Sequence, residues 1–410
     1  MKTHVRFFLN RVCDQEVSYV FHSKTCNESN IQSAEFYQGS SHYPLPGEEG
    51  YIMVVMKIRG GDLDLVEYEF PSFHPGENIR TLGFERAYPL NPVAGTVTVR
   101  APARIHLTVL DMNRFAPARP GGGGVGFALQ LYCSVEVSCI KSGIEIDYSR
   151  VGIIRHFVEV FKAVTGYQGG FRIRAKDHQH QHVGLGSTST IMISLANALN
   201  YAVGSPLTSD QLRKLVGNNY VEETASDAIA FAFETGVGPA VSIYGGMAIM
   251  GDELALAYHH PFAQGKNVFV VIPPSDISSA GTKEFDLLMN KGRLLDYRDR
   301  ELKAYLMLMD MIPALENDDL KRMGNIIWEI EFRGSKRAEV EHHSFEIYHY
   351  MSRLREAGFE FVGMSSVGPS IAIITEKDRA AVEGIVRGLG LSITVETMID
   401  NEGLKITHTC

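Results

Sequence analysis

The spacing of apolar and polar positions divides the chain into an irregular N-terminal part and a more regular remainder. In the first part, residues 51–58 and 63–70 carry apolar, strand-like sequences and predict two strands. Prolines and a glycine between residues 71 and 76 then interrupt the pattern. We expect residues 1–95 to form a β-rich or α+β extension, for which no motif indicates a role.

From residue 96 onward, segments with strand and helix spacing follow one another without an internal repeat or a βαβ order. The spacing predicts strands at residues 96–99, 103–109, 125–137, 170–175, 268–272 and 392–397. It also predicts a strand pair around Gly245 and Gly246 at residues 240–250, and two strands joined by a turn at residues 363–375. It predicts helices at residues 150–164, 191–203, 210–233, 281–290, 301–317, 321–357 with a break near Gly334, and 377–389. This order indicates an α+β fold with antiparallel strands, which we divide into domains at residues 96–265 and 266–410.

The amino-acid composition mainly excludes classes of protein. The 410 residues are 45% hydrophobic and 21% charged, which is ordinary for globular domains. The net charge of −9 and the pI of about 5.9 lack the basic surplus of a nucleic-acid-binding protein. Five cysteines without a CxxC pair favour reduced thiols, and we find no apolar run long enough to span a membrane. We therefore expect a cytoplasmic protein whose partners are small molecules rather than nucleic acids or membranes.

The clearest chemical signal is the stretch HVGLGSTST, residues 182–190, which precedes a long apolar helix. Small residues let consecutive backbone N–H groups surround an anion, and a helix N-terminus adds unpaired donors and a positive dipole. The predicted phosphate-binding residues are Gly184, Leu185, Gly186, Ser187, Thr188 and Ser189. A glycine-rich turn with a Ser or Thr cap would have the same sequence, and the lysine of a Walker loop is missing.

Three histidines alternate with glutamines just before this loop, at His178, His180 and His182. On an extended strand their side chains would share one face and could bind Zn²⁺ or Fe²⁺. Apart from Asp177, no nearby carboxylate or cysteine has a matching spacing. Of the three, therefore, we predict a contact with phosphate or substrate for His182, which adjoins the loop.

Three stretches, in order, resemble motifs of the GHMP superfamily, which includes galactokinase, homoserine kinase and mevalonate kinase. APARIHLTVLD at residues 101–111 resembles the first motif, and the glycine loop described above resembles the second. GMSSVGPSIAII at residues 363–374 resembles the third motif. The resemblance covers roughly residues 96–400 and implies a GHMP-kinase-like two-domain fold, preceded here by an N-terminal extension. It also suggests a homodimer.

Two functional positions depart from the kinases of this superfamily. The kinases typically have Gly-Glu-His after the first-motif strand, where this chain has Val109, Leu110 and Asp111. Many also have an aspartate that acts on the acceptor hydroxyl, and in TGVGPAVSIYGG (residues 235–246) its place is taken by Gly238. Glycine can neither accept a proton nor orient a hydroxyl. The sequence therefore favours a reaction other than phosphoryl transfer.

Within the superfamily, several stretches are similar to the β-ribofuranosylaminobenzene 5′-phosphate synthases of methanopterin biosynthesis and to the related C-nucleoside synthases. They are ARIHLTVLD, GGGGVGFAL, HVGLGSTST, TGVGPAVSIYGG, GMSSVGPS and PPSDISSAGTKEFDLL, the last at residues 273–288. The resemblance implies that phosphoribosyl pyrophosphate (PRPP) loses pyrophosphate while an aromatic carboxylate attacks its C1 through the ring and releases CO₂. The loop sequence and Val367, where that family has Trp, differ from the family pattern, so the aromatic acceptor is left open.

This chemistry assigns roles to the candidate residues. Asp111 is the predicted stabiliser of the ribosyl cation, and the other catalytic candidates are Arg104, His106 and His182. Mg²⁺ is the predicted cofactor, held by pyrophosphate with Ser187 and Glu222 as ligands. The predicted substrate-binding positions are Gly121, Gly122, Gly123, Gly124, Thr235, Gly236, Ser365, Ser366 and Gly368.

Each role has a structural alternative that the sequence leaves open. Arg104 could pair with an acid inside a strand, and Asp111 could cap the turn that follows it. The four glycines could form a hairpin tip, Ser365 and Ser366 could shape a turn, and Glu222 could lie on a solvated helix face. A C-ribosyl synthase is the first hypothesis. An ATP-dependent GHMP small-molecule kinase and a non-catalytic ligand-binding relative are the alternatives.

Overall fold

The computed structural model describes residues 72–115, 119–180, 182–224, 228–275 and 287–409, together with the backbone of three strands before residue 72. The chain divides into two compact units, Met1–Pro71 and Ser72–Cys410. Most of the predicted turn at residues 273–288 lies outside the described residues, because 276–286 are not among them.

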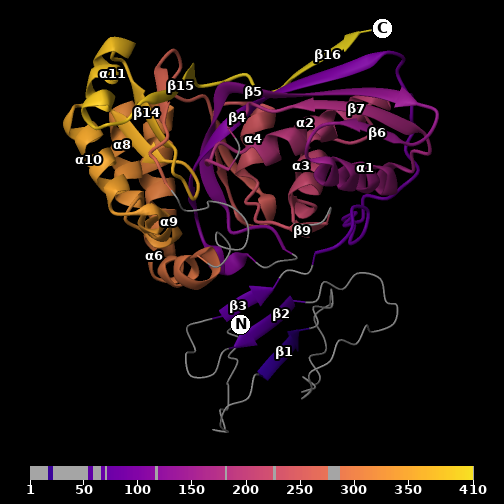
Figure 1. Ribbon diagram of the computed structural model, residues 1–410, viewed down its shortest axis with the longest axis horizontal. Coiled ribbons are helices and arrows are strands. Elements are labelled where there is room, and N and C mark those ends of the chain that lie inside the picture. The colour runs from indigo at the N-terminus through magenta and orange to yellow at the C-terminus, as the bar shows by residue number, and fades with distance from the viewer. Residues whose placement is uncertain are drawn as a thin grey trace. The chain divides into compact units, whose positions relative to one another are not determined.

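In the first unit, three strands form an antiparallel sheet in the order β1-β2-β3 (Figure 1). They are β1 (Val17–Phe21), β2 (Val54–Ile58) and β3 (Val66–Glu69). The last two fall within the runs that predict strands. The predicted domain limits at 95 and 265 stay predictions, but residues 72–95 belong to the second unit, where Phe73 pairs with Ile229 in an isolated β-bridge.

The larger sheet of the second unit has seven strands around the long central pair β4 and β5. The seven strands are β4 (Thr96–Val109), β5 (Gly124–Ile140), β6 (Ile144–Asp147), β7 (Gly170–Lys176), β10 (Met247–Met250), β11 (Leu256–His260) and β16 (Lys405–Thr409). Their order is β11-β10-β5-β4-β16, with β7 beside β5 and β6 beside β7. Neighbours are antiparallel except for the parallel pair of β6 and β7.

Helices cover one face of this sheet, as Figure 1 shows. They are α1 (Val151–Thr165), α2 (Ser187–Ala202), α3 (Ser209–Asn218) and α4 (Val237–Tyr244). Every residue of α2 except Tyr201 is buried, which is expected of a helix that is apolar on most sides and packs on β4 and β5. The helix that follows the glycine loop, α2, is therefore surrounded by other parts of the protein on nearly all sides.

The C-terminal part of the second unit is built on a four-stranded antiparallel sheet in the order β13-β14-β12-β15. Its strands are β12 (Asn267–Val271), β13 (Phe361–Met364), β14 (Ile371–Thr375) and β15 (Ile393–Met398). The helical elements around it are η3 (Leu287–Gly292), α6 (Arg293–Tyr305), η4 (Leu306–Met311), α7 (Ile312–Glu316), α8 (Leu320–Ile330), α9 (Gly334–His343), α10 (Glu346–Glu356) and α11 (Arg379–Gly388). The remaining short elements are η1 (Met112–Arg114), β8 (Val221–Glu223), β9 (Ile229–Phe231) and η2 (Asp252–Leu254).

One apolar core joins the two sheets of the second unit. The ring of Phe127 on β5 lies 5.2 Å from that of Phe262 and 5.8 Å from that of Phe361 on β13. Leu107 and Leu185 belong to the same buried cluster. The first-motif strand and the glycine loop therefore share a core with the sheet that carries the third motif.

The predicted α+β class is confirmed, whereas three predicted elements are wrong in detail. Residues 210–233 are α3 followed by the β8–β9 hairpin, and α4 replaces the first strand of the pair predicted at 240–250. Short apolar runs have the same composition in a helix and in a buried strand, so their spacing does not separate the two. The helical stretch predicted at 321–357 breaks near Gly334 as predicted, where α9 begins, but a second break before α10 makes it three helices rather than two. Among the described residues, no helix has the length and apolar composition to cross a bilayer.

Candidate active site

The three motif stretches meet around the loop that leads into α2. Ser365 Oγ donates to the carbonyl oxygen of Gly184 (2.6 Å), and Ser370 Oγ donates to that of Val183 (2.5 Å). From β4, the backbone N–H of His106 donates to Ser365 Oγ at 3.0 Å. The glycine loop, the third-motif turn and the first-motif strand are thus joined by hydrogen bonds into one site.

Two glycines give the loop its shape. Gly184 and Gly186 have φ angles of 91° and 72°, in the left-handed region that residues with a side chain rarely adopt. A Cβ on Gly184 would lie 2.4 Å from the carbonyl oxygen of Ser365, and one on Gly186 would lie 2.8 Å from Cγ of Arg104. The glycines are therefore needed both for the turn and for its close approach to its neighbours.

The first turn of α2 provides the anion-binding features that the sequence predicts. Gly186 is the N-cap, and Ser187, Thr188 and Ser189 follow it as buried residues. Such a turn presents backbone N–H groups without helical partners at the positive end of the helix dipole. Leu185 differs from its prediction in one respect. Its side chain belongs to the apolar core, so only its backbone is left for a ligand.

Two arginines flank this turn, and the sequence analysis identified one of them. Arg104 Nη1 donates to the carbonyl oxygen of Gly184 at 2.8 Å. Arg150, directly before α1, donates to Thr188 Oγ1 at 2.6 Å and forms an ion pair with Glu222. A single arginine before a helix has no motif, so its approach to α2 could not be read from the sequence. An anion at this helix end would be close to two guanidinium groups.

The β8–β9 hairpin brings acidic side chains to the same place. Glu222 accepts from Arg150 and, at 3.2 Å, from the hydroxyl of Tyr220. Burial and the charges of Glu222 and Glu234 raise the pKa of Tyr220, so its phenol stays protonated. Burial also raises the pKa of Glu234, whose carboxylate accepts from the N–H of Gly236 at 2.7 Å. Glu222 is thus bonded to protein donors through both oxygens, and the helix-face alternative for it is wrong.

His106 and Thr235 form a buried polar pair beside the loop. His106 Nε2 lies 3.3 Å from Thr235 Oγ1, and the His106 carbonyl accepts from the N–H of Ser366 at 2.6 Å. Burial, together with the positive charges of Arg104 and Lys336, holds the pKa of His106 well below its ordinary value. The imidazole is therefore neutral and can donate one hydrogen bond and accept another without adding charge.

A buried ion pair supports the third-motif turn, and sequence reasoning missed it. Lys336 Nζ donates to the carbonyl oxygen of Ser366 at 2.8 Å and lies 3.1 Å from the carboxylate of Glu339. Gly368 closes the turn by donating its N–H to the carbonyl of Ser365 at 2.9 Å. A lysine and a glutamate three residues apart are typical of an exposed helix surface, so their spacing gave no sign of burial.

Asp111 lies at the other end of β4. From Arg104 to Val109, the last residue of β4, the strand extends roughly 17 Å, at about 3.3 Å per residue. Asp111 accepts from the backbone and side-chain amides of Asn113, both at 2.9 Å, and pairs with Arg300 at 3.5 Å. These contacts make it the N-cap of η1, which was its structural alternative. A catalytic role for Asp111 stays a prediction.

The glycine run Gly121–Gly124 is buried against the protein's own atoms. A Cβ on Gly122 would lie 2.7 Å from the carbonyl oxygen of Asp111, and one on Gly124 would lie 3.0 Å from Nε2 of His106. The close approach that four glycines suggest is therefore made, in these contacts, to the chain itself. Whether they also contact a substrate stays a prediction.

With this geometry established, comparison with known proteins shows which families the chain resembles. Residues 152–235, from α1 through the glycine loop to Thr235, match the family described as GHMP kinases N terminal domain. Over this segment the chain is similar to the GHMP superfamily. The sequence resemblance to that superfamily is thereby confirmed.

Two curated proteins that are similar to this chain are named β-ribofuranosylphenol 5′-phosphate synthase. The protein from Methanothermobacter thermautotrophicus is 26% identical over 309 residues, which cover 70% of this chain and 91% of the relative. The protein from Archaeoglobus fulgidus is 27% identical over 333 residues, which cover 75% of this chain and 98% of the relative. The similarity thus extends over nearly the whole length of both relatives.

Solved structures confirm the predicted GHMP-kinase-like fold. Homoserine kinase from Cytophaga hutchinsonii is 13% identical, with a TM-score of 0.55 over 77% of this chain and 99% of that one. Mevalonate diphosphate decarboxylase from Staphylococcus aureus is 16% identical, with a TM-score of 0.55 over 77% of this chain and 99% of that one. At these identities the likeness concerns the fold alone.

The position that corresponds to the kinase aspartate is sterically closed in this chain. Gly238 is buried in α4, and a Cβ there would lie 2.4 Å from Oγ and 3.0 Å from Cβ of Ser189 on α2. A carboxylate side chain at residue 238 would therefore require α4 to move away from α2. Gly238, which leaves the site without the kinase base, is therefore also required by the packing of α4 against α2.

The histidine metal site is not formed. His178, His180 and His182 lie in a loop after β7 rather than on a strand, with His178 buried and His182 exposed. Within the described ranges, no group of three or more His, Cys, Asp or Glu residues could hold a metal ion. The donor set does not fit the predicted Mg²⁺ site either, since Glu222 is already bonded to Arg150 and Tyr220.

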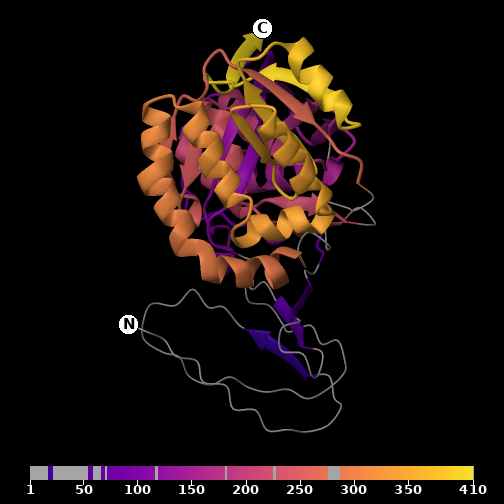
Figure 2. The ribbon, with the colours of Figure 1, turned by 90° about the vertical axis from the view of Figure 1, so that its left-hand side faces the viewer.

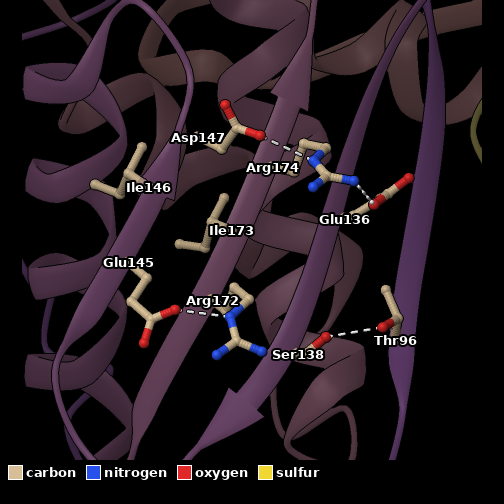
Figure 3. Close-up of a pocket in the computed structure, with 9 residues that line it drawn as sticks. All are labelled: Thr96, Glu136, Ser138, Glu145, Ile146, Asp147, Arg172, Ile173 and Arg174. Atoms are coloured by element: carbon tan, nitrogen blue, oxygen red, sulfur yellow. Dashed lines mark hydrogen bonds and ion pairs between the residues drawn. The ribbon is translucent and has the colours of Figure 1, made fainter.

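Figure 3 shows a groove on the exposed surface of β5, β6 and β7, which is a different polar site. Arg172 pairs with Glu145 at 2.7 Å, and Arg174 pairs with Asp147 at 2.9 Å and with Glu136 at 3.8 Å. The acidic and basic side chains compensate one another within the groove. The groove is therefore a weaker candidate binding site for a phosphorylated ligand than the N-terminus of α2 with its two arginines.

Proposed function

We propose that this protein is a C-ribosyl synthase that joins PRPP to an aromatic carboxylate, with release of pyrophosphate and CO₂. One observation carries the proposal: an anion-binding loop is combined with Gly238 at the place of the kinase aspartate, packed against Ser189. Such a site can hold a departing pyrophosphate but has no carboxylate there to act on an acceptor hydroxyl.

The similarity to curated synthases supports the same reaction class, because it extends over 91% and 98% of their lengths. The names of these relatives contain a phenol, which favours 4-hydroxybenzoate as the acceptor. As the resemblance implies, the product would enter a methanopterin-type cofactor.

In the proposed reaction two single bonds break and one carbon–carbon bond forms. The bond between C1 of the ribose and the pyrophosphate oxygen breaks, and its electron pair leaves with pyrophosphate. The ring carbon that bears the carboxylate then forms a carbon–carbon bond to C1. Finally the bond to the carboxylate breaks, CO₂ leaves, and that electron pair restores the aromatic ring. No oxidant or reductant is needed.

The residues around α2 match the demands of the leaving group. Backbone N–H groups of the first helical turn and the guanidinium of Arg104 can stabilise the negative charge that grows on pyrophosphate. Arg150 can add a second cation by way of Thr188. Mg²⁺ enters the proposal only as a counter-ion of PRPP, because the protein oxygens predicted to hold it are not available as a set.

The decisive assay supplies PRPP, MgCl₂ and carboxyl-labelled 4-hydroxybenzoate, and measures pyrophosphate and labelled CO₂ together. The proposal expects both products in a 1:1 ratio, and 4-aminobenzoate tested in parallel reports on acceptor choice. If no aromatic acid is turned over while ATP is consumed with a small alcohol, the protein is a kinase and the proposal fails. ATP binding without turnover of any substrate would instead favour a non-catalytic ligand-binding protein.

A matched pair of glycine substitutions ties the activity to the loop. Gly186 and Gly166 both have φ of 72°, so aspartate brings the same backbone strain to each. A Cβ on Gly186 meets Arg104, whereas one on Gly166 has nothing within 4 Å. Gly186→Asp should lower the rate at least 100-fold by repelling phosphate, while Gly166→Asp should keep it. Equal rates for both variants would remove the loop from the mechanism.

A further inference from the structure

Arg150 is a buried cation that joins three segments beside the anion-binding turn. It directly precedes α1, and its side chain is 8% exposed. Its guanidinium donates to Oγ1 of Thr188 on α2 at 2.6 Å and to the carboxylate of Glu222 on β8. Its Nε lies 3.9 Å from the carboxylate of Glu223. These segments belong to the part of the second unit that lies behind the orange C-terminal helices in Figure 2. One positive charge thus ties together the start of α1, the first turn of α2 and the β8–β9 hairpin.

The charge of Arg150 is permanent. Burial alone would lower the pKa of its guanidinium, but the neighbouring acidic groups, first of them Glu222, raise that pKa above the ordinary value of an arginine. An arginine side chain also stays protonated in proteins generally. The site between α2 and the hairpin therefore always contains a cation, as a site with a bound metal ion does.

The two oxygens that Arg150 bonds are a donor pair for a divalent cation. A hydroxyl at the start of a phosphate-binding helix and a nearby carboxylate are oxygen ligands that a phosphate-bound Mg²⁺ prefers. The sequence predicts such a pair in Ser187 and Glu222. In the structure the pair is Thr188 and Glu222, and both side chains are bonded to the same guanidinium. Arg150 therefore lies where a metal ion would bridge them.

The carboxylates of this site are also held by donors other than Arg150. Glu222 accepts from the hydroxyl of Tyr220 at 3.2 Å, and Glu223 accepts from the backbone N–H of Gly152 at 3.0 Å. Their side chains are 29% and 34% exposed, so an ion from solution can reach them. If a smaller residue replaced Arg150, two positioned carboxylates would remain beside a hydroxyl, which is a site for a divalent cation.

We propose that Arg150 is a built-in substitute for a divalent cation, and that it occupies the site between Thr188 and Glu222 and gives the anion-binding turn its positive charge. The chain binds the pyrophosphate group of its substrate without ligating Mg²⁺ through its own side chains, and Mg²⁺ enters only with PRPP. The part of this inference that concerns pyrophosphate rests on the proposed function. The occupied metal site does not, because it follows from the contacts of Arg150 alone.

The first test titrates Mn²⁺, which binds the same oxygen ligands as Mg²⁺, into the full chain without substrate and counts bound ions by electron paramagnetic resonance. Arg150→Ala should bind one Mn²⁺ ion more than wild type, because Thr188 and Glu222 lose their cation. That ion should raise the melting temperature of Arg150→Ala and leave the melting temperature of wild type unchanged. Two matched controls should lack the extra ion: Arg150→Lys, which keeps a positive charge, and Arg150→Ala/Glu222→Gln, which loses the carboxylate.

Two results of this titration would overturn the proposal. A folded Arg150→Ala variant that gains no ion would show that Arg150 only ties the three segments together. A wild type that binds an ion which Glu222→Gln removes would show that a metal and Arg150 share the site. Circular dichroism checks that each variant is folded. Arg150→Met, which keeps most of the aliphatic volume, replaces Arg150→Ala if the alanine variant does not fold.

The second test measures the binding of inorganic pyrophosphate by calorimetry, in EDTA and in MgCl₂. Wild type should bind pyrophosphate in EDTA, and Mg²⁺ should not strengthen the binding. Arg150→Ala should bind it about 10-fold more weakly in EDTA, through loss of a charged interaction, and Mg²⁺ should recover most of that loss. Wild-type binding that requires Mg²⁺ overturns the proposal. A wild type that binds no pyrophosphate in either condition instead refutes the proposed reaction, while the Mn²⁺ titration still decides whether Arg150 occupies a metal site.

Discussion

Replacing Gly238 with alanine tests whether the place of the kinase aspartate is closed. Alanine normally stabilises a helix by about 1 kcal/mol relative to glycine. At Gly238, however, the added Cβ meets Oγ of Ser189 at 2.4 Å and Cβ of Ser189 at 3.0 Å. Neither atom belongs to a long flexible side chain, so α4 or α2 has to shift.

The two effects have opposite signs, and their sizes decide the outcome. Overpacking a well-filled interior costs about 1–3 kcal/mol, which offsets the helix gain of about 1 kcal/mol. Gly238→Ala should therefore leave the free energy of unfolding unchanged or lower it by up to about 2 kcal/mol. Gly384 is the matched control, because it is exposed in α11 and a Cβ there has nothing within 4 Å. Gly384→Ala should stabilise the protein by about 1 kcal/mol.

Urea unfolding followed by circular dichroism measures both variants under the same conditions. Gly238→Ala should be about 1–3 kcal/mol less stable than Gly384→Ala. Adding Ser189→Ala should recover part of that loss by removing the nearer atom, so the double-mutant cycle should show a favourable coupling. If Gly238→Ala is as stable as Gly384→Ala, there is room for a side chain at residue 238, and the steric argument against a kinase fails.

Three further predictions follow from buried and charged groups. Arg104→Met should lower kcat/KM for PRPP by about 10- to 100-fold, through loss of a charged hydrogen bond of about 1.5–3 kcal/mol, and Arg104→Lys should be intermediate. Burial, together with the charge of Arg80, lowers the pKa of His156 to about 4. The unfolded chain, with a pKa near 6.5, is therefore protonated first, and stability should fall by up to about 1.4 kcal/mol per pH unit between pH 6.5 and 4. His156→Asn should remove that part of the slope in urea titrations, and an unchanged slope would contradict the assignment. Lys336→Met should cost about 3–5 kcal/mol by leaving Glu339 buried without its cation, and adding Glu339→Leu should restore most of it.

Sequence predicted the parts of this protein whose signals are local. Gly184 and Gly186 adopt positive φ angles, which few residue types other than glycine adopt easily. The loop can therefore be recognised from the sequence. The alternation of apolar and polar residues along β4 predicts a strand, and the continuous apolar run of α2 predicts a buried helix. Superfamily resemblance then joined segments about 80 and 180 residues apart, and the hydrogen bonds from Ser365 to Gly184 and from Arg104 to Gly184 confirm that they meet.

What the sequence could not predict depends on contacts between distant segments. Lys336 looks like a surface residue because its neighbours in sequence are charged, yet it is buried against the Ser366 carbonyl. Arg150 reaches Thr188 only because α1 and α2 pack together. Asp111 has the residue type of a catalytic group, but a local bond to Asn113 and the length of β4 separate it from the loop. Residue type and spacing therefore identify the phosphate loop. The side chains that bring positive charge to the loop or support it, such as Arg150 and Lys336, can be identified only from the tertiary structure.

The packing at Gly238 also connects the chemistry to the architecture. In this chain the missing carboxylate is not an isolated loss, because the space that it would need is filled by the first turn of α2, at Ser189. That turn also carries Thr188, held by Arg150, and it is anchored through Gly186 to Arg104. A single Gly238→Asp change therefore adds a base only if α4 or the anion-binding turn of α2 shifts. A site with the kinase aspartate at residue 238 would therefore need at least a second change, at Ser189.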